Sequence, residues 1–181
     1  MDRLQTLSSH LIAPKEEFRY STSAGCLTYE QRKFYEEYGY IVVPGLYSKE
    51  DMQSWESRFL EYCDGKSRPM GMQLVRDISL VKAKKAIKGQ AGVTKIQDWQ
   101  EDEVLYTYCT KKELIPYLKS FCGEDVKSVH TMLINKPPYM GKTSRHPLHQ
   151  DLAYFPFRSE DQIVAAWTAM EDITRDNGMF M

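Results

Sequence analysis

Hydrophobic residues recur with helical spacing in the first part of the chain. Phe34 and Tyr38 stand four apart, and we expect a helix over 28–38 that buries both. Thr28 and Gln31 form a capping-box pattern at its start, and Gly39 fits a left-handed C-cap. The apolar run 40–43 that follows predicts a short buried strand, ended by a Pro-Gly pair.

A second helix is predicted from the same kind of signal. Ser48 with Asp51 repeats the capping-box pattern. An apolar face then recurs at helical spacing, which indicates packing in the core, at Met52, Trp55, Phe59 and Tyr62.

The third predicted helix has a less certain start. Thr110 and Glu113 again suggest a capping box, and Leu114 and Phe121 lie on the apolar face. Pro116 would fall beyond the first turn of a helix capped by Thr110, so a later start or a kink is the alternative.

Strand patterns dominate the rest of the chain. Residues 72–81 are rich in β formers, and residues 126–135 alternate so that His130, Met132 and Ile134 share one face. Residues 162–170 form a continuous apolar run that predicts a further strand, and 176–178 predict a hairpin turn.

This order of elements predicts an α+β domain. The N-terminal helices precede strands that resemble the first part of a jelly roll, or double-stranded β-helix, which needs about eight strands. We count four or five and therefore expect an incomplete sheet. The predicted organisation is an N-terminal segment and linker over 1–26 and one partial folded domain over 27–181.

Composition narrows the class of protein. The 181 residues carry a net charge of −1 and are 42% hydrophobic, which suits one soluble domain. Near-neutral charge gives no support for nucleic-acid binding, and no apolar run is long enough to span a membrane. Four separated cysteines without a CxxC pattern predict reduced thiols.

Two segments have patterns linked to particular roles: the N-terminus to protein targeting, and a basic run to the attraction of an anionic ligand. Arg3-Leu4, five residues, then His10-Leu11 resembles the type-2 peroxisomal signal that an import receptor reads, although an ordinary N-terminus is the alternative. The basic, glycine-flanked run 82–88 is typical of a solvated loop. A loop that attracts an anion, such as the phosphates of coenzyme A, is the sharper alternative.

His149 and Asp151 are the candidate metal ligands. On an extended chain, residues two apart project to the same side, so the imidazole and the carboxylate converge. Two histidines and one carboxylate form the facial triad of non-haem Fe(II) oxygenases. A histidine near an aspartate is also commonplace on protein surfaces, so this pattern alone is weak.

Several long runs of the sequence resemble the phytanoyl-CoA dioxygenase family. They cover nearly everything from residue 27 onward, at 27–37, 94–98, 130–138, 144–151, 154–158 and 166–171. The resemblance implies that 1–26 are a targeting segment and linker and that 27–181 are a partial Fe(II)/2-oxoglutarate dioxygenase domain, in which His149 and Asp151 bind Fe(II). It also implies that the cosubstrate 2-oxoglutarate contacts Lys95, Met132 and Trp167 in addition to the two metal ligands. Without the resemblance, Met132 and Trp167 would be read as core residues and Lys95 as a solvated charge.

The resemblance further implies an activity. Members hydroxylate a branched acyl-CoA such as phytanoyl-CoA at C2, the first step of fatty acid α-oxidation in peroxisomes, with ascorbate in a supporting role.

The family's second histidine ligand and its 2-oxoglutarate arginine have no match here. His130 is the least unlikely replacement ligand, and His146 is read as exposed or supporting. The rival hypotheses are a truncated, non-catalytic form and, more remotely, a zinc hydrolase, which would need a third protein ligand.

Overall fold

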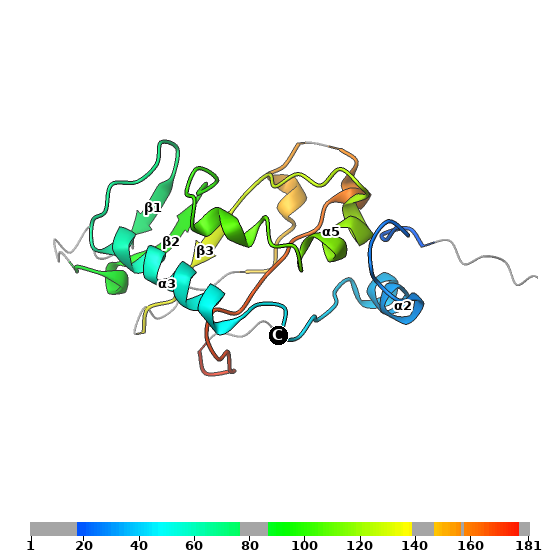
Figure 1. The fold of residues 1–181 in the computed structure, drawn as a ribbon, viewed down its shortest axis with the longest axis horizontal. Helices are drawn as coiled ribbons and strands as arrows, with labels where there is room; N and C mark the ends of the chain where they lie inside the picture. Colours follow the sequence, from blue (N-terminus) through cyan, green and yellow to red (C-terminus); the bar gives the residue numbers. More distant parts are fainter. Residues whose placement is uncertain (1–17, 77–86, 139–146, 157, 178–181) are drawn as a thin grey trace, which may run out of the picture.

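The computed structural model describes residues 18–76, 87–138, 147–156 and 158–177. Its helices are α2 (Tyr29–Tyr38), α3 (Lys49–Cys63) and α5 (Ile115–Cys122), and its strands are β1 (Gln73–Arg76), β2 (Val93–Gln97) and β3 (Met132–Ile134). Short 3-10 helices complete the fold: η1 (Gln90–Gly92), η2 (Leu105–Tyr108), η4 (Asp151–Ala153) and η5 (Glu160–Gln162). The sheet and α3 lie toward one end of the molecule and α2 toward the other (Figure 1).

The first helix confirms the predicted caps but not the predicted burial. Thr28 and Gln31 form a reciprocal capping box, and Gly39 adopts a left-handed conformation at the C-cap. Phe34 and Tyr38 are exposed and pack on each other, with ring centroids 4.6 Å apart. The helix instead meets α5 through Tyr35, so the aromatic spacing pointed to the wrong face.

The predicted strand over 40–43 is wrong. The structure has an irregular segment there, with Tyr40 and Val42 exposed. Tyr40 packs against Phe34 at a centroid distance of 5.4 Å. The run pairs with no strand among the described residues, and a β-rich composition does not by itself form a strand without a ladder partner.

Helix α3 carries the core, as predicted. Its capping box is formed by Ser48 and Asp51, and Trp55, Phe59 and Tyr62 are buried along one face. These side chains pack with Val93 of β2 and with further residues from α3, the ends of β1 and β2, and η2, which complete the buried cluster: Cys63, Met72, Ile96, Trp99 and Leu105. Figure 1 shows α3 running alongside the sheet.

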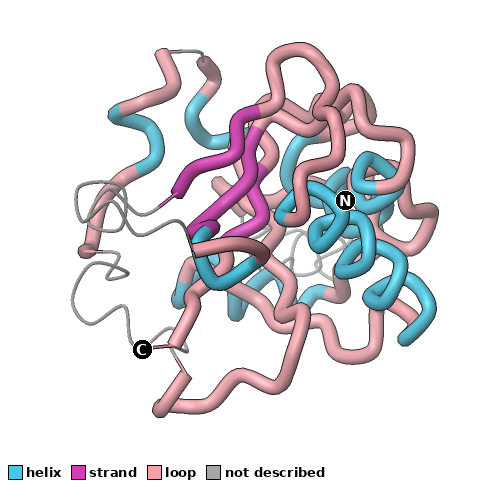
Figure 2. Tube along the Cα trace, turned by 90° about the vertical axis from the view of Figure 1, so that its left-hand side faces the viewer, coloured by secondary structure: helices cyan, strands magenta, loops and turns pink. Residues whose placement is uncertain are grey.

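The three strands form an antiparallel sheet in the order β1-β2-β3. Figure 2 shows them side by side. The strand expected over 72–81 is observed over 73–76, and residues 77–81 lie outside the described part. The strand expected over 126–135 is shorter, at Met132–Ile134, but its alternation is confirmed: Leu133 is half-buried, whereas Met132 and Ile134 are exposed.

Helix α5 begins at Ile115, the later of the two predicted starts. The capping box predicted at Thr110 is wrong, because its hydroxyl donates to Tyr106 O and the helix has no side-chain cap. Pro116 lies in the first helical turn, where a missing N–H costs nothing. Leu114 and Phe121 are buried, as predicted.

The strand predicted over 162–170 is also wrong. Residues 160–162 form η5, and 163–169 are irregular and belong to no ladder among the described residues. Asn177 N donates to Thr174 O at 3.3 Å in a turn. Because Gly178 lies outside the described residues, the hairpin stays a prediction.

Other predictions fall partly or wholly outside the described residues: the N-terminal signal, His146 and most of the basic run 82–88. The four cysteines are all described and form no disulfide. Among the helices of the described ranges, none is long and apolar enough to cross a membrane.

Candidate metal and cosubstrate site

His149 and Asp151 converge in the structure. The His149 Nε2 atom lies 3.1 Å from Asp151 Oδ1. Between them Gln150 is extended (φ −113°, ψ 121°), and Asp151 opens the short helix η4. The expected convergence therefore arises from one extended residue followed by a turn, not from a strand.

The tautomer of His149 is fixed by its other ring nitrogen. Nδ1 lies 2.8 Å from the Pro147 carbonyl oxygen, which can only accept, so Nδ1 carries a proton. This hydrogen bond is the main cause that raises the pKa of His149, and the charge of Asp151 raises it further. In the neutral ring, Nε2 is then the atom with a free lone pair.

The donor set fits two positions of a non-haem iron site. Metal-bound histidines commonly donate their second ring N–H to a backbone carbonyl, as His149 does here. Both side chains are open to solvent, 48% and 61% exposed, so an ion can reach Nε2 and the carboxylate together. Bound Fe(II) would supply the O₂ chemistry, while His149 and Asp151 would hold it.

No group of three potential ligands gathers within the described residues. His130, considered as a replacement third ligand, turns its Nδ1 to Asp98 Oδ1 at 3.1 Å. The replacement-ligand hypothesis for His130 is therefore not supported: its imidazole pairs with a carboxylate other than Asp151.

Lys95 and Met132 lie on the same face of the sheet. Lys95 pairs with Ile134 and Gln97 pairs with Met132, and directly paired residues of an antiparallel ladder project to the same side. The opposite face carries Leu133, which packs against the buried cluster. The register thus sets a half-buried cation near the exposed apolar side chains of β3.

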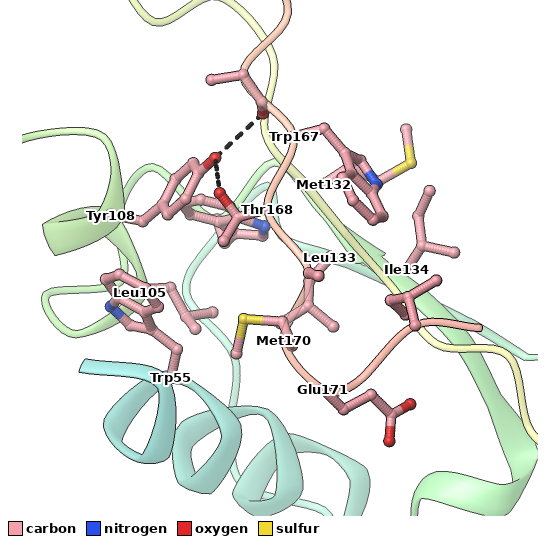
Figure 3. A pocket seen from close by; sticks show the side chains of 14 residues that line it. Trp55, Leu105, Tyr108, Met132, Leu133, Ile134, Trp167, Thr168, Met170 and Glu171 are labelled. Atoms are coloured by element: carbon pink, nitrogen blue, oxygen red, sulfur yellow. Dashed lines mark hydrogen bonds between the residues drawn. The ribbon is translucent and has the colours of Figure 1, made fainter. Parts of the chain in front are cut away.

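Trp167 and Met132 both line a cavity of about 170 Å³. Figure 3 shows the two side chains close together at one side of it. The other walls come from α3, the loop after β2, η2, β3 and the segment after η5, and are mainly apolar: Trp55, Trp99, Leu105, Tyr108, Leu133, Ile134, Ala166, Thr168, Ala169, Met170, Glu171 and Ile173. Met132 and Trp167 thus line one cavity, and their role as walls for 2-oxoglutarate stays a prediction.

The metal pair is not part of this cavity lining. Its segment nevertheless reaches the start of β3, because the Phe155 ring lies 5.7 Å from the His130 imidazole. The structure thus joins Met132 with Trp167 in one cavity, sets Lys95 on the same sheet face, and carries His149 with Asp151 on an adjoining exposed segment.

Sequence reasoning missed Tyr108 and Asp98. The Tyr108 hydroxyl donates to Ala166 O at 3.1 Å and lies 3.0 Å from Thr168 Oγ1, which fixes the segment that carries Trp167 (Figure 3). Asp98, which orients His130, has a positive φ of 59°. No local sequence pattern indicates the role of Tyr108. For Asp98, directly after β2, a signal was available, because aspartate tolerates the left-handed backbone conformation better than most residues do.

An imidazole and a carboxylate converge on a segment that adjoins a sheet face, and this face carries a cation and apolar side chains. The arrangement defines a candidate non-haem metal site. Comparison with known proteins gives the family: the model described as phytanoyl-CoA dioxygenase (PhyH) matches residues 35–181, and the chain belongs to this family.

Relatives agree with this assignment. The chain is 48% identical over 174 residues to the human protein named "Phytanoyl-CoA dioxygenase, peroxisomal", covering 96% of this chain and 51% of the relative. The mouse protein of the same name is 49% identical over 173 residues, covering 95% and 51%. A Caenorhabditis elegans protein named "Probable phytanoyl-CoA dioxygenase" is 43% identical, covering 88% and 52%. The chain spans about half the length of these relatives.

Proposed function

We propose that this chain belongs to an Fe(II)- and 2-oxoglutarate-dependent dioxygenase that hydroxylates a branched acyl-CoA, such as phytanoyl-CoA, at C2. The observation that carries the proposal is the His149 Nε2–Asp151 Oδ1 approach of 3.1 Å, with Nδ1 held by Pro147 O, in a member of this family. The names of the relatives support the acyl-CoA substrate.

The proposed roles follow the chemistry of each side chain. His149 and Asp151 hold the metal, and Lys95 supplies positive charge to the cosubstrate. Met132 and Trp167 form apolar walls that exclude water from it. Their place in the lining of one cavity supports this assignment. Ascorbate is proposed only in a supporting role.

We further propose that the complete fold of the enzyme is a jelly roll, to which 27–181 contribute the described helices and sheet. The closed double-sheet architecture would place a metal site between its sheets. Membership of the family supports this, as does the antiparallel pairing of β1, β2 and β3.

The test of the metal site is anaerobic titration of the 181-residue chain with Fe(II) and 2-oxoglutarate, followed by visible absorption. A saturable charge-transfer band is expected, and His149→Ala should abolish it because the neutral Nε2 ligand is lost. His130→Ala is the matched control: it removes a histidine that pairs with Asp98, and the band should persist. A folded sample without a band, or loss of the band only in His130→Ala, contradicts the proposed ligands.

The proposed location is the peroxisome, supported by the names of the mammalian relatives and by the Arg3-Leu4-x5-His10-Leu11 pattern that an import receptor would read. A fluorescent protein carrying residues 1–26 at its N-terminus should enter peroxisomes, and Leu4→Arg should leave it in the cytosol. Diffuse fluorescence of the unmodified fusion contradicts the signal.

A further inference from the structure

Two glutamines lie on the sheet face that carries Lys95 and Met132. The ladder pairs Gln73 with Gln97 and Gln97 with Met132, and directly paired residues of an antiparallel ladder project to the same side. Lys95 stands two residues before Gln97 on β2, so it projects to that side as well. The glutamines therefore adjoin the residues that we assign to the cosubstrate.

Asp98 collects hydrogen bonds from both glutamines and from a histidine. Its Oδ2 lies 3.4 Å from Gln73 Nε2 and 3.4 Å from Gln97 Nε2, and its Oδ1 lies 3.1 Å from His130 Nδ1. Its backbone has a φ of 59°, a left-handed conformation that few residues other than glycine adopt. Strained backbone of this kind is concentrated at functional sites, so the surroundings of Asp98 merit a search for a ligand.

The carboxylate of Asp98 determines which atoms of its neighbours stay available. A carboxylate only accepts hydrogen bonds, so both glutamine amides turn their nitrogen toward it and His130 carries its proton on Nδ1. The Oε1 atoms of Gln73 and Gln97, and Nε2 of His130, take part in no hydrogen bond among the described residues. In the neutral ring Nε2 is an acceptor, so all three atoms are acceptors. We call Gln73, Gln97 and His130 the acceptor row.

The acceptor row is open to solvent and lies beside the segment that carries the metal pair. Gln73 is exposed, Gln97 is half-buried, and the His130 and Asp98 side chains are each 29% exposed. The Phe155 ring, on the same segment as the metal pair, packs 5.7 Å from the His130 imidazole. A molecule bound to the row would therefore lie next to the proposed metal and cosubstrate.

We propose that the acceptor row binds the pantetheine arm of the acyl-CoA substrate, whose amide N–H groups donate to Gln73, Gln97 and His130. This inference rests on the proposed function and adds the residues that recognise the substrate as a CoA thioester. The reacting C2 atom is bonded to the thioester carbonyl carbon. Holding the pantetheine arm on one side of the thioester thus helps to position C2 on the other.

The chemistry of the row does not suit the other parts of an acyl-CoA. Phosphate groups are anionic acceptors, so the acceptor atoms and the charge of Asp98 would repel them. A branched alkyl chain brings no donor and would remove water from the acceptors without replacing its hydrogen bonds. Amide N–H groups are uncharged donors, and they match every available atom of the row.

The first experiment is isothermal titration of the 181-residue chain, without added metal, with S-butanoyl-pantetheine, a soluble fragment of an acyl-CoA. We expect saturable binding that is weakened ~3–10-fold in Gln97→Met, which keeps the side-chain length and removes the acceptor. Gln53→Met is the matched control, because Gln53 is an exposed glutamine on α3 outside the row. It should bind the probe as tightly as the unmodified chain does.

A modified probe tests the same contacts without changing the protein. Methylation of both amide nitrogens of S-butanoyl-pantetheine removes its N–H donors, and binding to the unmodified chain should weaken ~3–10-fold or more. The further loss in Gln97→Met should be smaller, because the same hydrogen bond is then removed from both sides. Fully additive losses would contradict a contact between Gln97 and the amides.

The metal titration keeps this inference apart from the proposed function, because S-butanoyl-pantetheine binding needs no iron. Binding of the thioester without a charge-transfer band supports the acceptor row and contradicts the proposed metal ligands. Absence of thioester binding overturns the acceptor row, whether or not the band forms. Equal binding by the unmodified chain and Gln97→Met also overturns it, as does tighter binding of inorganic phosphate than of the thioester.

Discussion

At the residue scale, Asp102 is the side chain that most directly stabilises the core. It is 3% exposed, and its Oδ1 accepts from Val104 N at 3.0 Å and Leu105 N at 2.7 Å. Its Oδ2 accepts from the Tyr62 hydroxyl and lies 3.7 Å from Arg58 Nε. One carboxylate thus joins α3 to the start of η2.

Asp102→Ala should therefore lower the free energy of unfolding by about 3 kcal/mol or more, because several buried donors lose their acceptor together. Urea denaturation measures the change. Glu103→Ala is the matched control: Glu103 also contacts Arg58, at 3.5 Å, but its side chain is 90% exposed. That variant should change stability by less than about 1 kcal/mol, and equal losses in both variants would contradict the role of Asp102.

Tyr62 makes the free energy of unfolding depend on pH in the alkaline range. Burial, and then the hydrogen bond to Asp102, raise the pKa of the Tyr62 phenol to about 12, above the ordinary value of about 10. The folded state therefore holds this proton where the unfolded state has released it. The stabilisation, roughly 2–3 kcal/mol, is complete below about pH 10 and is lost as pH rises to about 12.

The expected result is a fall in unfolding free energy between pH 10 and 12 in urea titrations, with a shallower fall in Tyr62→Phe. A Tyr62→Phe variant with the full alkaline slope would assign that slope to other groups. Tyr108 is one such group, because burial raises its pKa too.

At the element scale, α2 and α3 have the same cap but different consequences for the fold. Thr28 Oγ1 accepts from Gln31 N at 3.2 Å, and Ser48 Oγ accepts from Asp51 N at 3.1 Å. Helix α2 has no buried residue, whereas α3 buries Trp55, Phe59, Tyr62 and Cys63. A cap affects global stability only when its helix belongs to the core that unfolds as a unit.

Ser48→Ala should therefore lower the global free energy of unfolding by about 1 kcal/mol. Thr28→Ala should leave it nearly unchanged and speed amide exchange within 29–38 only. Urea denaturation with hydrogen exchange distinguishes the two. A global loss in Thr28→Ala as large as that in Ser48→Ala would show that α2 folds together with the core.

At the scale of the whole molecule, α2 is joined to the rest through α5. The Tyr35 and Phe121 rings pack at a tilt with centroids 4.4 Å apart, and Thr22 N donates to Ser120 O at 2.6 Å. Between them, Gly25 lies so close to α5 that a Cβ would overlap Ser120 and the Pro116 carbonyl oxygen. The packing of this end thus requires glycine at 25.

Gly25→Ala should separate the segment 18–38 from α5. Hydrogen exchange should speed up in α2 and α5, while α3 and β2 keep their protection because their core is separate from this contact. Unchanged exchange in α2 would contradict the close packing, and loss of protection in α3 would show that the two ends unfold together.

The sequence by itself determined the elements whose signals are local. Capping boxes at Thr28 and Ser48, the glycine cap at 39, the buried face of α3 and the alternation of β3 all depend on residues within one element, and the structure confirms them. The His149–Asp151 approach is local too, since the two residues are neighbours in the chain.

Only the tertiary structure decided what depends on distant partners. The apolar runs at 40–43 and 163–169 form no strand, because a strand needs a paired neighbour that composition does not reveal. The sheet register sets Lys95 on the face of Met132, folding brings Trp167 to Met132, and Asp98 draws His130 away from the metal pair. Each contact joins segments more than 30 residues apart, beyond the reach of any local pattern.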